Sequence, residues 1–441
     1  MTTTEWCNWA GTERVTPRRV ETPASSEEVS AAVKRATSEG LPVKAIGSGH
    51  SFTGVAVAPG LQLRLDHLTG IVDVDGVSGL VTVEAGTPLH SLNPALAAHG
   101  LGMEVLGDID RQTVAGAVST GTHGSGGAFG SISTQVRGLE LVLADGSVVT
   151  CSATERPDLY AAACVSIGAL GVITKVTLQC VPLYALRAVD AAAPLEQTLD
   201  SIDELVAEND HFEFFWFPHT DTALTRRFQR LPATTPLNPM SKWSRVVDDR
   251  IVTNIAFEAL NRVGTRIPAL VPGINRLVTK AVSDREFTDV AHRVFASERN
   301  VKFREGEYFI PRDALVPALK DLKSWLDTSG EKVSFPFEVR FVRRDDIWLS
   351  PAYERDCAVV SFHQYHRMPH ERWFRACEDV LGAVGGRPHW GKMHRLDAVV
   401  LRERYPRFDD FLSVRRDVDP HGAFANPYLD RVLGPVTGAR R

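Results

Sequence analysis

Two glycine-rich loops are the parts of this sequence best suited to hold an anion. Residues 47–51 read GSGHS and residues 121–127 read GTHGSGG, so hydroxyl side chains are interleaved with glycines in both. Without a Cβ the backbone can approach a bound group closely, and consecutive N–H groups form a positively polarised nest. The pattern predicts that the loops converge on a pyrophosphate, although a plain turn remains the alternative for either loop alone. The candidate ligands are Gly47, Ser48, Gly49, Ser51, Gly121, Thr122, Gly124 and Ser125.

Two charged residues share one face of the segment 335–341, which reads FPFEVRF. Side chains alternate along a strand, so Glu338 and Arg340 point to one side while aromatic and aliphatic residues occupy the other. A carboxylate can orient the guanidinium toward a developing alkoxide, where a fixed cation is worth more than in water. A structural salt bridge is the alternative interpretation.

Three isolated residues add candidate chemistry. His50 lies at the tip of the first loop, His363 alternates with Tyr365 on an apolar segment, and Lys392 follows Trp390 in a glycine-flanked loop. An ordinary hydrogen-bonded histidine or a surface lysine explains each of them equally simply. Spacing alone therefore assigns them no role.

Several common site motifs do not occur in the sequence. It contains no GxGxxG, GxSxG, HExxH or CxxC, which argues against a Rossmann dinucleotide site, an α/β-hydrolase and a metal cage, so no metal is expected. Residues 386–392, GRPHWGK, have the spacing of a P-loop, but Met393 stands where Ser or Thr must hold magnesium. Nucleotide hydrolysis is not expected.

The elements that must position these residues alternate between helices and strands. Apolar spacing and capping residues predict an amphipathic helix over 26–40, and a short strand, 43–46, then leads into the first loop. The aromatic run 211–217 predicts a buried strand, with a substrate wall as the alternative. Further predictions are short strands around 61–65, 72–74 and 81–83, a helix from Thr87 to Gly100 with Pro88 in its first turn, a hairpin over 139–151, a helix over 158–164 and a strand over 171–181. The pattern indicates an α+β fold.

A change of composition near Pro182 divides the chain. The small-residue, glycine-rich character ends there, and an aromatic-rich stretch follows before glycine, proline and histidine return near Gly385. We expect domains over 1–184 and 185–384, and a C-terminal segment over 385–441. The segment 231–250 is the predicted mobile loop.

Composition excludes several classes of partner. The chain is 44% hydrophobic and 23% charged, with a net charge of −5, so it is globular and has no basic run for a nucleic acid. No apolar run is long enough for a membrane span, and the start lacks the pattern of a secretory signal. The six cysteines are scattered, which favours reduced thiols in a cytoplasmic protein.

Taken together, five motifs resemble a known family. GSGHSF at 47–52, VAGAVSTGTHGSG at 114–126, SIGALGVIT at 166–174, FEVR at 337–340 and RPHWGKMH at 387–394 are similar to the aldonolactone oxidoreductases. These are the L-gulono-1,4-lactone oxidases and dehydrogenases of the vanillyl-alcohol-oxidase group of FAD enzymes. The resemblance implies a PCMH-type FAD-binding domain at 1–184, a substrate cap domain at 185–384 and a C-terminal segment that returns to the flavin.

The resemblance also implies roles for individual residues. His50 would carry the FAD covalently, and the two glycine loops would hold its pyrophosphate and ribityl chain. Thr113 would lie near flavin and substrate, and Ile173 near the adenine side. Glu338, Arg340 and Lys392 would be catalytic, with Glu338 and Arg340 facing the substrate and Lys392 beside flavin N1. His363 would bind substrate; alditol oxidases have threonine at this position, which favours the lactone enzymes.

The implied reaction is oxidation of the C2 hydroxyl of an aldono-1,4-lactone such as L-gulono-1,4-lactone, with hydride passing to flavin N5 and ascorbate or an analogue as product. The main alternative is an alditol (xylitol-type) oxidase that produces hydrogen peroxide. An NADPH-fed flavin reductase and a binding module without redox activity are further alternatives. The electron acceptor, oxygen or a cytochrome, quinone or dye, stays open, as do the exact lactone and the oligomeric state.

Overall fold

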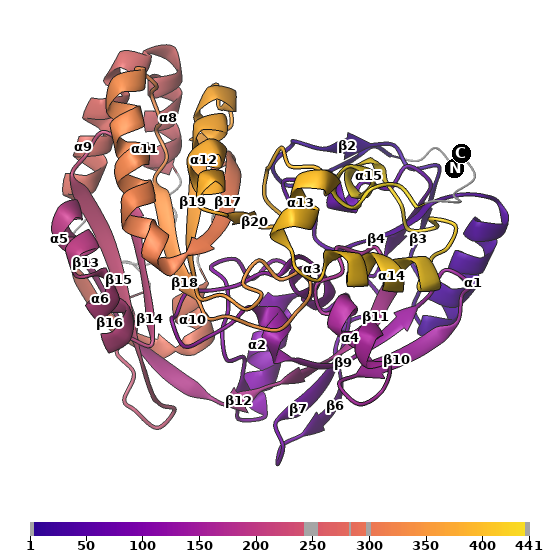
Figure 1. Cartoon of the computed structure of the whole chain (residues 1–441). Coiled ribbons are helices and arrows are strands. Elements are labelled where there is room, and N and C mark those ends of the chain that lie inside the picture. Colours follow the sequence, from indigo (N-terminus) through magenta and orange to yellow (C-terminus); the bar gives the residue numbers. More distant parts are fainter. Residues whose placement is uncertain (1–3, 242–254, 282–283, 297–300, 437–441) are drawn as a thin grey trace.

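The computed structural model describes residues 4–241, 255–281, 284–296 and 301–436. Figure 1 shows two lobes, one built around a large sheet and the other around smaller sheets, with helices packed on both. The mixed architecture confirms the predicted α+β class. No helix among the described residues is both long and apolar enough to cross a membrane.

The first lobe contains a parallel three-stranded sheet in the order β3-β5-β4 and a five-stranded sheet in the order β10-β9-β11-β7-β6. Two small pairs, β1 with β2 and β8 with β12, flank these sheets. The strands are β1 (Trp6–Cys7), β2 (Arg14–Val15), β3 (Arg19–Glu21), β4 (Val43–Ile46), β5 (Leu61–Arg64), β6 (Ile71–Asp75), β7 (Leu80–Glu84), β8 (Leu101–Gly102), β9 (Val136–Val142), β10 (Val148–Ser152), β11 (Val172–Gln179) and β12 (Val181–Pro182). The helices are α1 (Ser26–Ser38), η1 (Gly54–Ala56), α2 (Leu89–Ala98), α3 (Val114–Thr120), η2 (Ile132–Gln135) and α4 (Pro157–Ala163).

Local sequence signals set most of these elements. The Ser25 hydroxyl accepts the Glu28 N–H and begins α1, whose Val29 and Val33 are buried. Strand β4 and the hairpin of β9 and β10 lie where they were predicted. The prediction for the second helix was wrong in one respect, because Pro88 is the N-cap of α2 and not part of its first turn. The neighbouring Leu89 N–H donates to the Gln112 carbonyl instead of remaining free.

The second lobe is an eight-stranded sheet in the order β16-β13-β15-β14-β18-β19-β17-β20. Its strands are β13 (Tyr184–Pro194), β14 (His211–Trp216), β15 (Thr222–Pro232), β16 (Arg285–Val290), β17 (Phe303–Pro311), β18 (Phe337–Val342), β19 (Cys357–Tyr365) and β20 (Arg387–Pro388). Its helices are α5 (Leu195–Asp200), α6 (Ile202–Glu208), α8 (Phe257–Arg266), η4 (Pro268–Leu270), α9 (Val271–Ala281), α10 (Ala291–Phe295), η5 (Arg312–Ala314), α11 (Leu315–Ser329) and α12 (Glu371–Ala383). The loop predicted at 231–250 begins at the end of β15, and its residues 242–250 lie outside the described part.

The two faces of the large sheet differ sharply in polarity. Phe214, Val339 and Val360 point to the face covered by α11 and α12, where they form an apolar core. Period-two alternation then directs Glu338 and Arg340 to the opposite face. That face turns toward the first lobe, because the Gly126 N–H donates to the Phe341 carbonyl across the lobe boundary.

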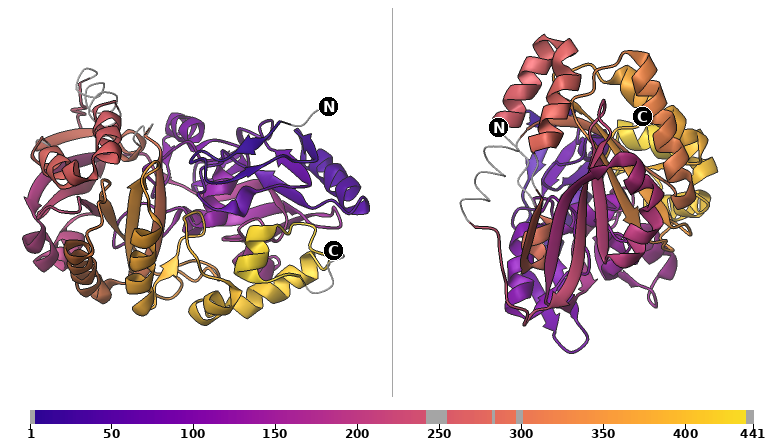
Figure 2. Two further views of the ribbon diagram at one scale, coloured as in Figure 1. Left: turned by 90° about the horizontal axis from the view of Figure 1, so that it is seen from above. Right: turned by 90° about the vertical axis from the view of Figure 1, so that its left-hand side faces the viewer.

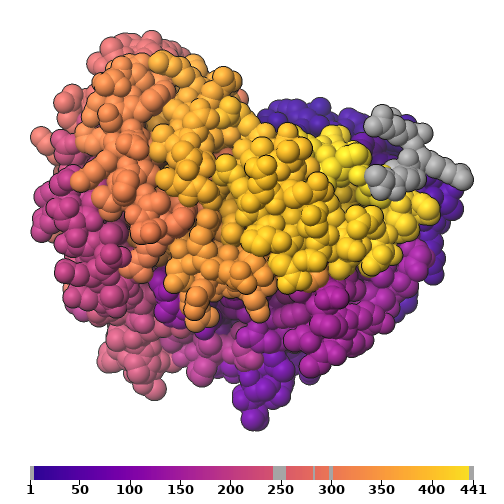
Figure 3. All heavy atoms as spheres, in the orientation of Figure 1, coloured from indigo at the N-terminus to yellow at the C-terminus, as the bar shows by residue number. Residues whose placement is uncertain are grey.

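The C-terminal segment packs against the first lobe through α13 (Ala398–Arg404), α14 (Phe408–Val418) and α15 (Pro427–Leu433). Figure 2 shows these yellow helices beside the first lobe, and in Figure 3 the same segment spreads over the purple N-terminal half. The large sheet starts at Tyr184 and ends at Pro388. The division at 184 and 385 stays a prediction, and this change of sheet supports it.

We expect Asn426 to anchor the C-terminal segment. Its side-chain amide donates to the carbonyls of Gly54, Val55 and Val57, and its oxygen accepts the Leu429 N–H as the N-cap of α15. Asn426→Ala should lower the free energy of unfolding by about 2–4 kcal/mol, because it removes the cap and leaves buried carbonyls without donors.

Urea unfolding followed by tryptophan fluorescence measures this change. The control is Asn209→Ala, which removes one partly buried bond to the Leu205 carbonyl and should cost about 1 kcal/mol or less. Equal effects of the two substitutions would contradict the anchoring role.

Candidate functional site

A cleft lies in the first lobe. Its walls come from β4 and the first glycine loop, from α3 with the residues before it, and from the segment 167–173. Phe424 of the C-terminal segment also lines it. The predicted residues on its walls are Gly47, Ser48, Gly49, His50, Ser51, Thr113 and Ile173.

The first loop can form this wall only because of its glycines. Gly49 has a φ of +70°, in the left-handed region that side chains disfavour. A Cβ on Gly47 would lie 2.6 Å from the Thr113 hydroxyl, which caps α3 by accepting the Gly116 N–H. The backbone is therefore packed closely and leaves a smooth cradle. Such a wall fits a ligand that is extended and anionic, such as a dinucleotide.

Lys44 is a cleft residue that sequence reasoning missed. It is buried in β4, and its Nζ donates to the Gly168 carbonyl at 2.7 Å. Burial, and after it the charge of Arg415, lowers the pKa of Lys44 to about 7. An anion in the cleft would restore the charged form of Lys44. The sequence signal for this residue was a lysine inside the apolar strand VKAI.

The second glycine loop does not line the cleft. Ser125 donates to the Phe212 carbonyl and accepts the Phe341 N–H, and the Thr122 hydroxyl accepts from the Gln112 amide. A Cβ on Gly124 would lie 2.3 Å from the Leu106 carbonyl. Gly121 ends α3 with a φ of +73°. Ser125 thus ties the loop to the large sheet, and the assignment of these four residues as FAD ligands stays a prediction.

Arg340 lies among three carboxylates on the polar face of the large sheet. Its Nε lies 3.2 Å from Glu213 and its Nη2 3.4 Å from Asp108, and Nη2 also donates to Glu338. Burial opposes the charge, but Glu338, Asp108 and Glu213 outweigh burial and raise the pKa of Arg340. The predicted pair is thus part of a larger buried cluster.

The cluster continues across the sheet as a row of alternating charges. Arg226 bonds to Glu213 at 2.9 Å and lies 3.2 Å from Asp190, which also pairs with Arg285 at 2.6 Å. The strand register places Arg285, Asp190, Arg226 and Glu213 opposite one another on four consecutive strands. Cross-strand pairing of opposite charges stabilises such neighbours.

Lys392 and His363 both lie beside Glu305, which is the second site residue that sequence reasoning missed. Lys392 Nζ lies 2.5 Å from one Glu305 oxygen and His363 Nε2 lies 3.3 Å from the other. Burial alone would raise the pKa of Glu305, but Lys392 and His363 lower it to about 2. Lys392 is therefore a half-buried cation held by a carboxylate and not a free surface lysine. The sequence signal for Glu305 was the pair of acidic residues, Glu305 and Glu307, within the strand segment FREGEYFIP.

His50 and the Lys392 loop are held together. The Phe52 N–H donates to the Gly391 carbonyl at 2.7 Å, and Lys392 Nζ lies 5.3 Å from the Phe52 ring centroid. The His50 ring stacks on Trp9. Burial, followed by Lys392 and Arg111, lowers the pKa of His50, which keeps its imidazole neutral. The cleft wall at His50 thus lies beside the Lys392 loop and its ion pair with Glu305.

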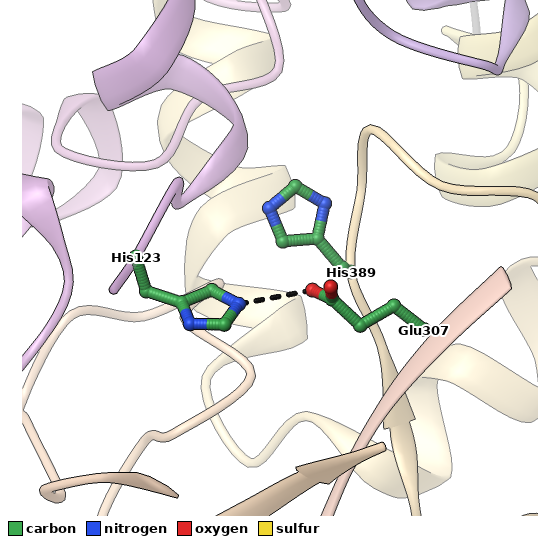
Figure 4. A group of neighbouring side chains, drawn as sticks. All are labelled: His123, Glu307 and His389. Atoms are coloured by element: carbon green, nitrogen blue, oxygen red, sulfur yellow. Dashed lines mark hydrogen bonds and ion pairs between the residues drawn. The ribbon is translucent and has the colours of Figure 1, made fainter. Parts of the chain in front are cut away.

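His123, Glu307 and His389 form a cluster with metal-ligand chemistry, drawn in Figure 4. His123 Nε2 lies 3.0 Å from Glu307 while its Nδ1 bonds to the Gly124 carbonyl, so both ring nitrogens face acceptors. His389 Nδ1 accepts the Gly391 N–H, which leaves the ring proton on Nε2. His389 therefore has no free lone pair, and the cluster is better explained as an ion pair of His123 with Glu307 than as a metal centre.

Comparison with known proteins identifies the family. Residues 176–432 match the family described as D-arabinono-1,4-lactone oxidase, and residues 17–152 match the one described as FAD binding domain. L-gulono-1,4-lactone dehydrogenase of Mycobacterium tuberculosis is 43% identical, covering 98% of this chain and 99% of its own length. L-gulonolactone oxidase of Mus musculus is 34% identical over 97% of both chains. Alditol oxidase of a Streptomyces species is 32% identical, covering 97% of this chain and 98% of its own.

A solved structure confirms the architecture. Cholesterol oxidase from B. sterolicum superposes with a TM-score of 0.81 over 98% of this chain and 97% of its own, at 18% identity, which bears on the fold alone. The chain therefore belongs to the D-arabinono-1,4-lactone oxidase family and is an FAD-dependent oxidoreductase with the two-domain fold of the vanillyl-alcohol-oxidase group.

Proposed function

We propose that this enzyme oxidises the C2 hydroxyl of an aldono-1,4-lactone such as L-gulono-1,4-lactone and yields ascorbate or an analogue. The observation that carries the proposal is the junction of the cleft with the buried charges. His50 lines the cleft, and the Lys392 loop bonds to Phe52, directly after the first glycine loop. Relatives named for gulono- and arabinono-lactone oxidation support this substrate class.

The cleft residues would hold the cofactor. Gly47, Ser48, Gly49 and Ser51 offer backbone and hydroxyl donors beside Lys44, and Thr113 and Ile173 complete the wall. FAD bound there supplies the acceptor for the hydride that leaves the substrate carbon. We place His50 at the flavin as its covalent attachment, since a neutral imidazole nitrogen is the nucleophilic form.

The charged residues would act on the substrate. Arg340 is fixed by three carboxylates, so it can stabilise negative charge on the C2 oxygen without reorienting. Glu338 orients Arg340 and offers an acceptor oxygen for the hydroxyl proton. Lys392, half-buried and paired with Glu305, would set positive charge at the flavin, and His363 faces the same carboxylate and would contact the lactone. The free cysteines, five of them buried, support a cytoplasmic enzyme.

Loss of the Arg340 charge should slow turnover without releasing the cofactor. Arg340→Ala and Glu338→Gln should each lower kcat for L-gulono-1,4-lactone by about 10²–10⁴-fold, because proton transfer and charge stabilisation are lost. Steady-state kinetics with a dye acceptor measure this, and the flavin absorbance of each variant verifies that FAD is still bound. Turnover of Arg340→Ala at the parent rate would remove this pair from the mechanism.

A substrate panel separates the proposal from the alditol alternative. The alditol oxidase relative makes this alternative concrete. A lactone enzyme should turn over L-gulono-1,4-lactone faster than xylitol at equal concentration. Faster oxidation of xylitol would replace the proposed substrate class and leave the FAD oxidoreductase assignment standing.

The yellow colour of the flavin shows whether FAD is attached to the protein covalently. After acid precipitation, the yellow colour of the parent protein should stay with the pellet, whereas the flavin of His50→Ala should be released to the supernatant. A matched substitution, His67→Ala, at a histidine outside the cleft lining, should behave as the parent. Release of flavin from the parent would refute the covalent bond while leaving the FAD site in place.

Chelation tests the interpretation of the histidine cluster. Because the Gly391 N–H occupies the His389 lone pair, dialysis against EDTA should leave lactone turnover unchanged. Elemental analysis of the parent should find no stoichiometric metal. Activity lost on chelation and restored by a divalent cation would show that the cluster binds metal.

A further inference from the structure

The helices α8 and α9 carry their apolar residues on the outside. Large aliphatic side chains at five positions are between 43% and 67% exposed, namely Ile255, Val263, Ile267, Leu270 and Leu277. Five of the eleven exposed large hydrophobic residues of the described chain thus fall within this short stretch. Figures 1 and 2 show the two helices side by side at the outer end of the large lobe.

The inner side of the same segment carries both apolar and polar residues. Val271 is buried, Phe257 packs beside it, and the Asn275 amide donates to the carbonyls of Pro218 and Val333 at 2.9 Å. A helix on a water-soluble surface normally turns its large apolar residues to the core. Here large aliphatic side chains also remain on the outer face, which is therefore suited to an apolar environment.

Cations surround the exposed apolar residues. Residues 259–281 contain Arg262, Arg266, Arg276 and Lys280 and no aspartate or glutamate, in a chain whose net charge is −5. All four are exposed. Arg262 pairs with Glu258, while the other three have no ion-pair partner among the residues that the structure describes. Arg276 and Lys280 are neighbours on α9, and Leu277 is also a neighbour of Lys280, because residues three and four apart share a helix face.

We propose that the outer face of α8, η4 and α9 docks on the surface of an anionic lipid membrane. Aliphatic side chains would enter the acyl boundary, and the long stems of arginine and lysine would let their charges stay at the lipid headgroups. A second copy of the chain is a poorer occupant, because a symmetric contact would bring the same cations face to face. An anionic membrane complements both the exposed aliphatic side chains and the cations around them.

The docked face lies near the proposed redox centre. Val271 and Phe257 pack on an aromatic cluster that includes Phe335, whose ring centroid lies 6.5 Å from that of His363. Membrane docking would therefore place that side of the enzyme against the bilayer. The docking itself does not depend on which substrate is oxidised.

Vesicle co-sedimentation of the holoenzyme tests the proposal. The protein should pellet with vesicles of phosphatidylglycerol and phosphatidylcholine, pellet far less with pure phosphatidylcholine, and be released by high salt. The double variant Ile267→Asp with Leu277→Asp should lower vesicle affinity roughly tenfold or more. Arg276→Gln with Lys280→Gln should lower it by roughly fivefold for each charge removed.

Matched controls lie on distant surfaces. Val77→Asp changes a fully exposed apolar residue of the β6–β7 turn, and Arg416→Gln removes an exposed cation of α14, so both should bind as the parent does. Lactone turnover in solution should be the same for all variants. Absence of parent binding to anionic vesicles, or equal losses in the controls, would overturn the proposal. A parent dimer that Leu277→Asp converts to a monomer would assign the face to a second copy instead.

Discussion

The burial of Arg340 is the constraint on which the polar face of the large sheet depends. A guanidinium taken out of water costs several kcal/mol unless carboxylates and hydrogen bonds compensate it. Glu338, Glu213 and Asp108 provide that compensation from two strands and from the first lobe. The negative charge of Glu213 must itself be neutralised, and Arg226 does this; Asp190 then neutralises the positive charge of Arg226. The row of alternating charges follows from the need to neutralise each buried charge in turn.

The same reasoning distinguishes Arg340 from the two lysines, Lys392 and Lys44. Lys392 is compensated by Glu305 and keeps its charge, and its pKa is raised, with the nearby carboxylates outweighing burial. Lys44 donates to the Gly168 carbonyl, and burial, followed by the charge of Arg415, lowers its pKa to about 7. Arg340 and Lys392 are therefore charged without a ligand, whereas Lys44 would become fully charged if an anion entered the cleft. A diphosphate in the cleft is the kind of group that completes this arrangement.

Local patterns predicted the parts of this site that depend on neighbouring residues in the chain. Alternation placed Glu338 and Arg340 on one face, and glycines marked the first loop, because both properties are decided within a few residues. Glu213 and Glu305 were missed because they approach through strand order: β14 lies beside β18, and β17 beside β19, despite their separation in sequence. Asp108 was missed because it reaches Arg340 from a loop of the first lobe. The second loop was expected beside the first, but its hydroxyls bond to Phe212, Phe341 and Gln112, contacts that no local pattern specifies.

The C-terminal segment explains how two lobes can share one reaction site. Lys392 comes from the loop after β20, yet that loop is bonded to the first lobe, since the Phe52 N–H donates to Gly391 and the Thr53 hydroxyl donates to the Trp390 carbonyl. Further along, Asn426 fastens the same segment to the carbonyls of residues 54–57. A lysine whose counter-ion lies on the large sheet is thereby fixed relative to the cleft of the first lobe. Because catalysis depends on such relative positions to within a fraction of an ångström, the tail would be part of the proposed site.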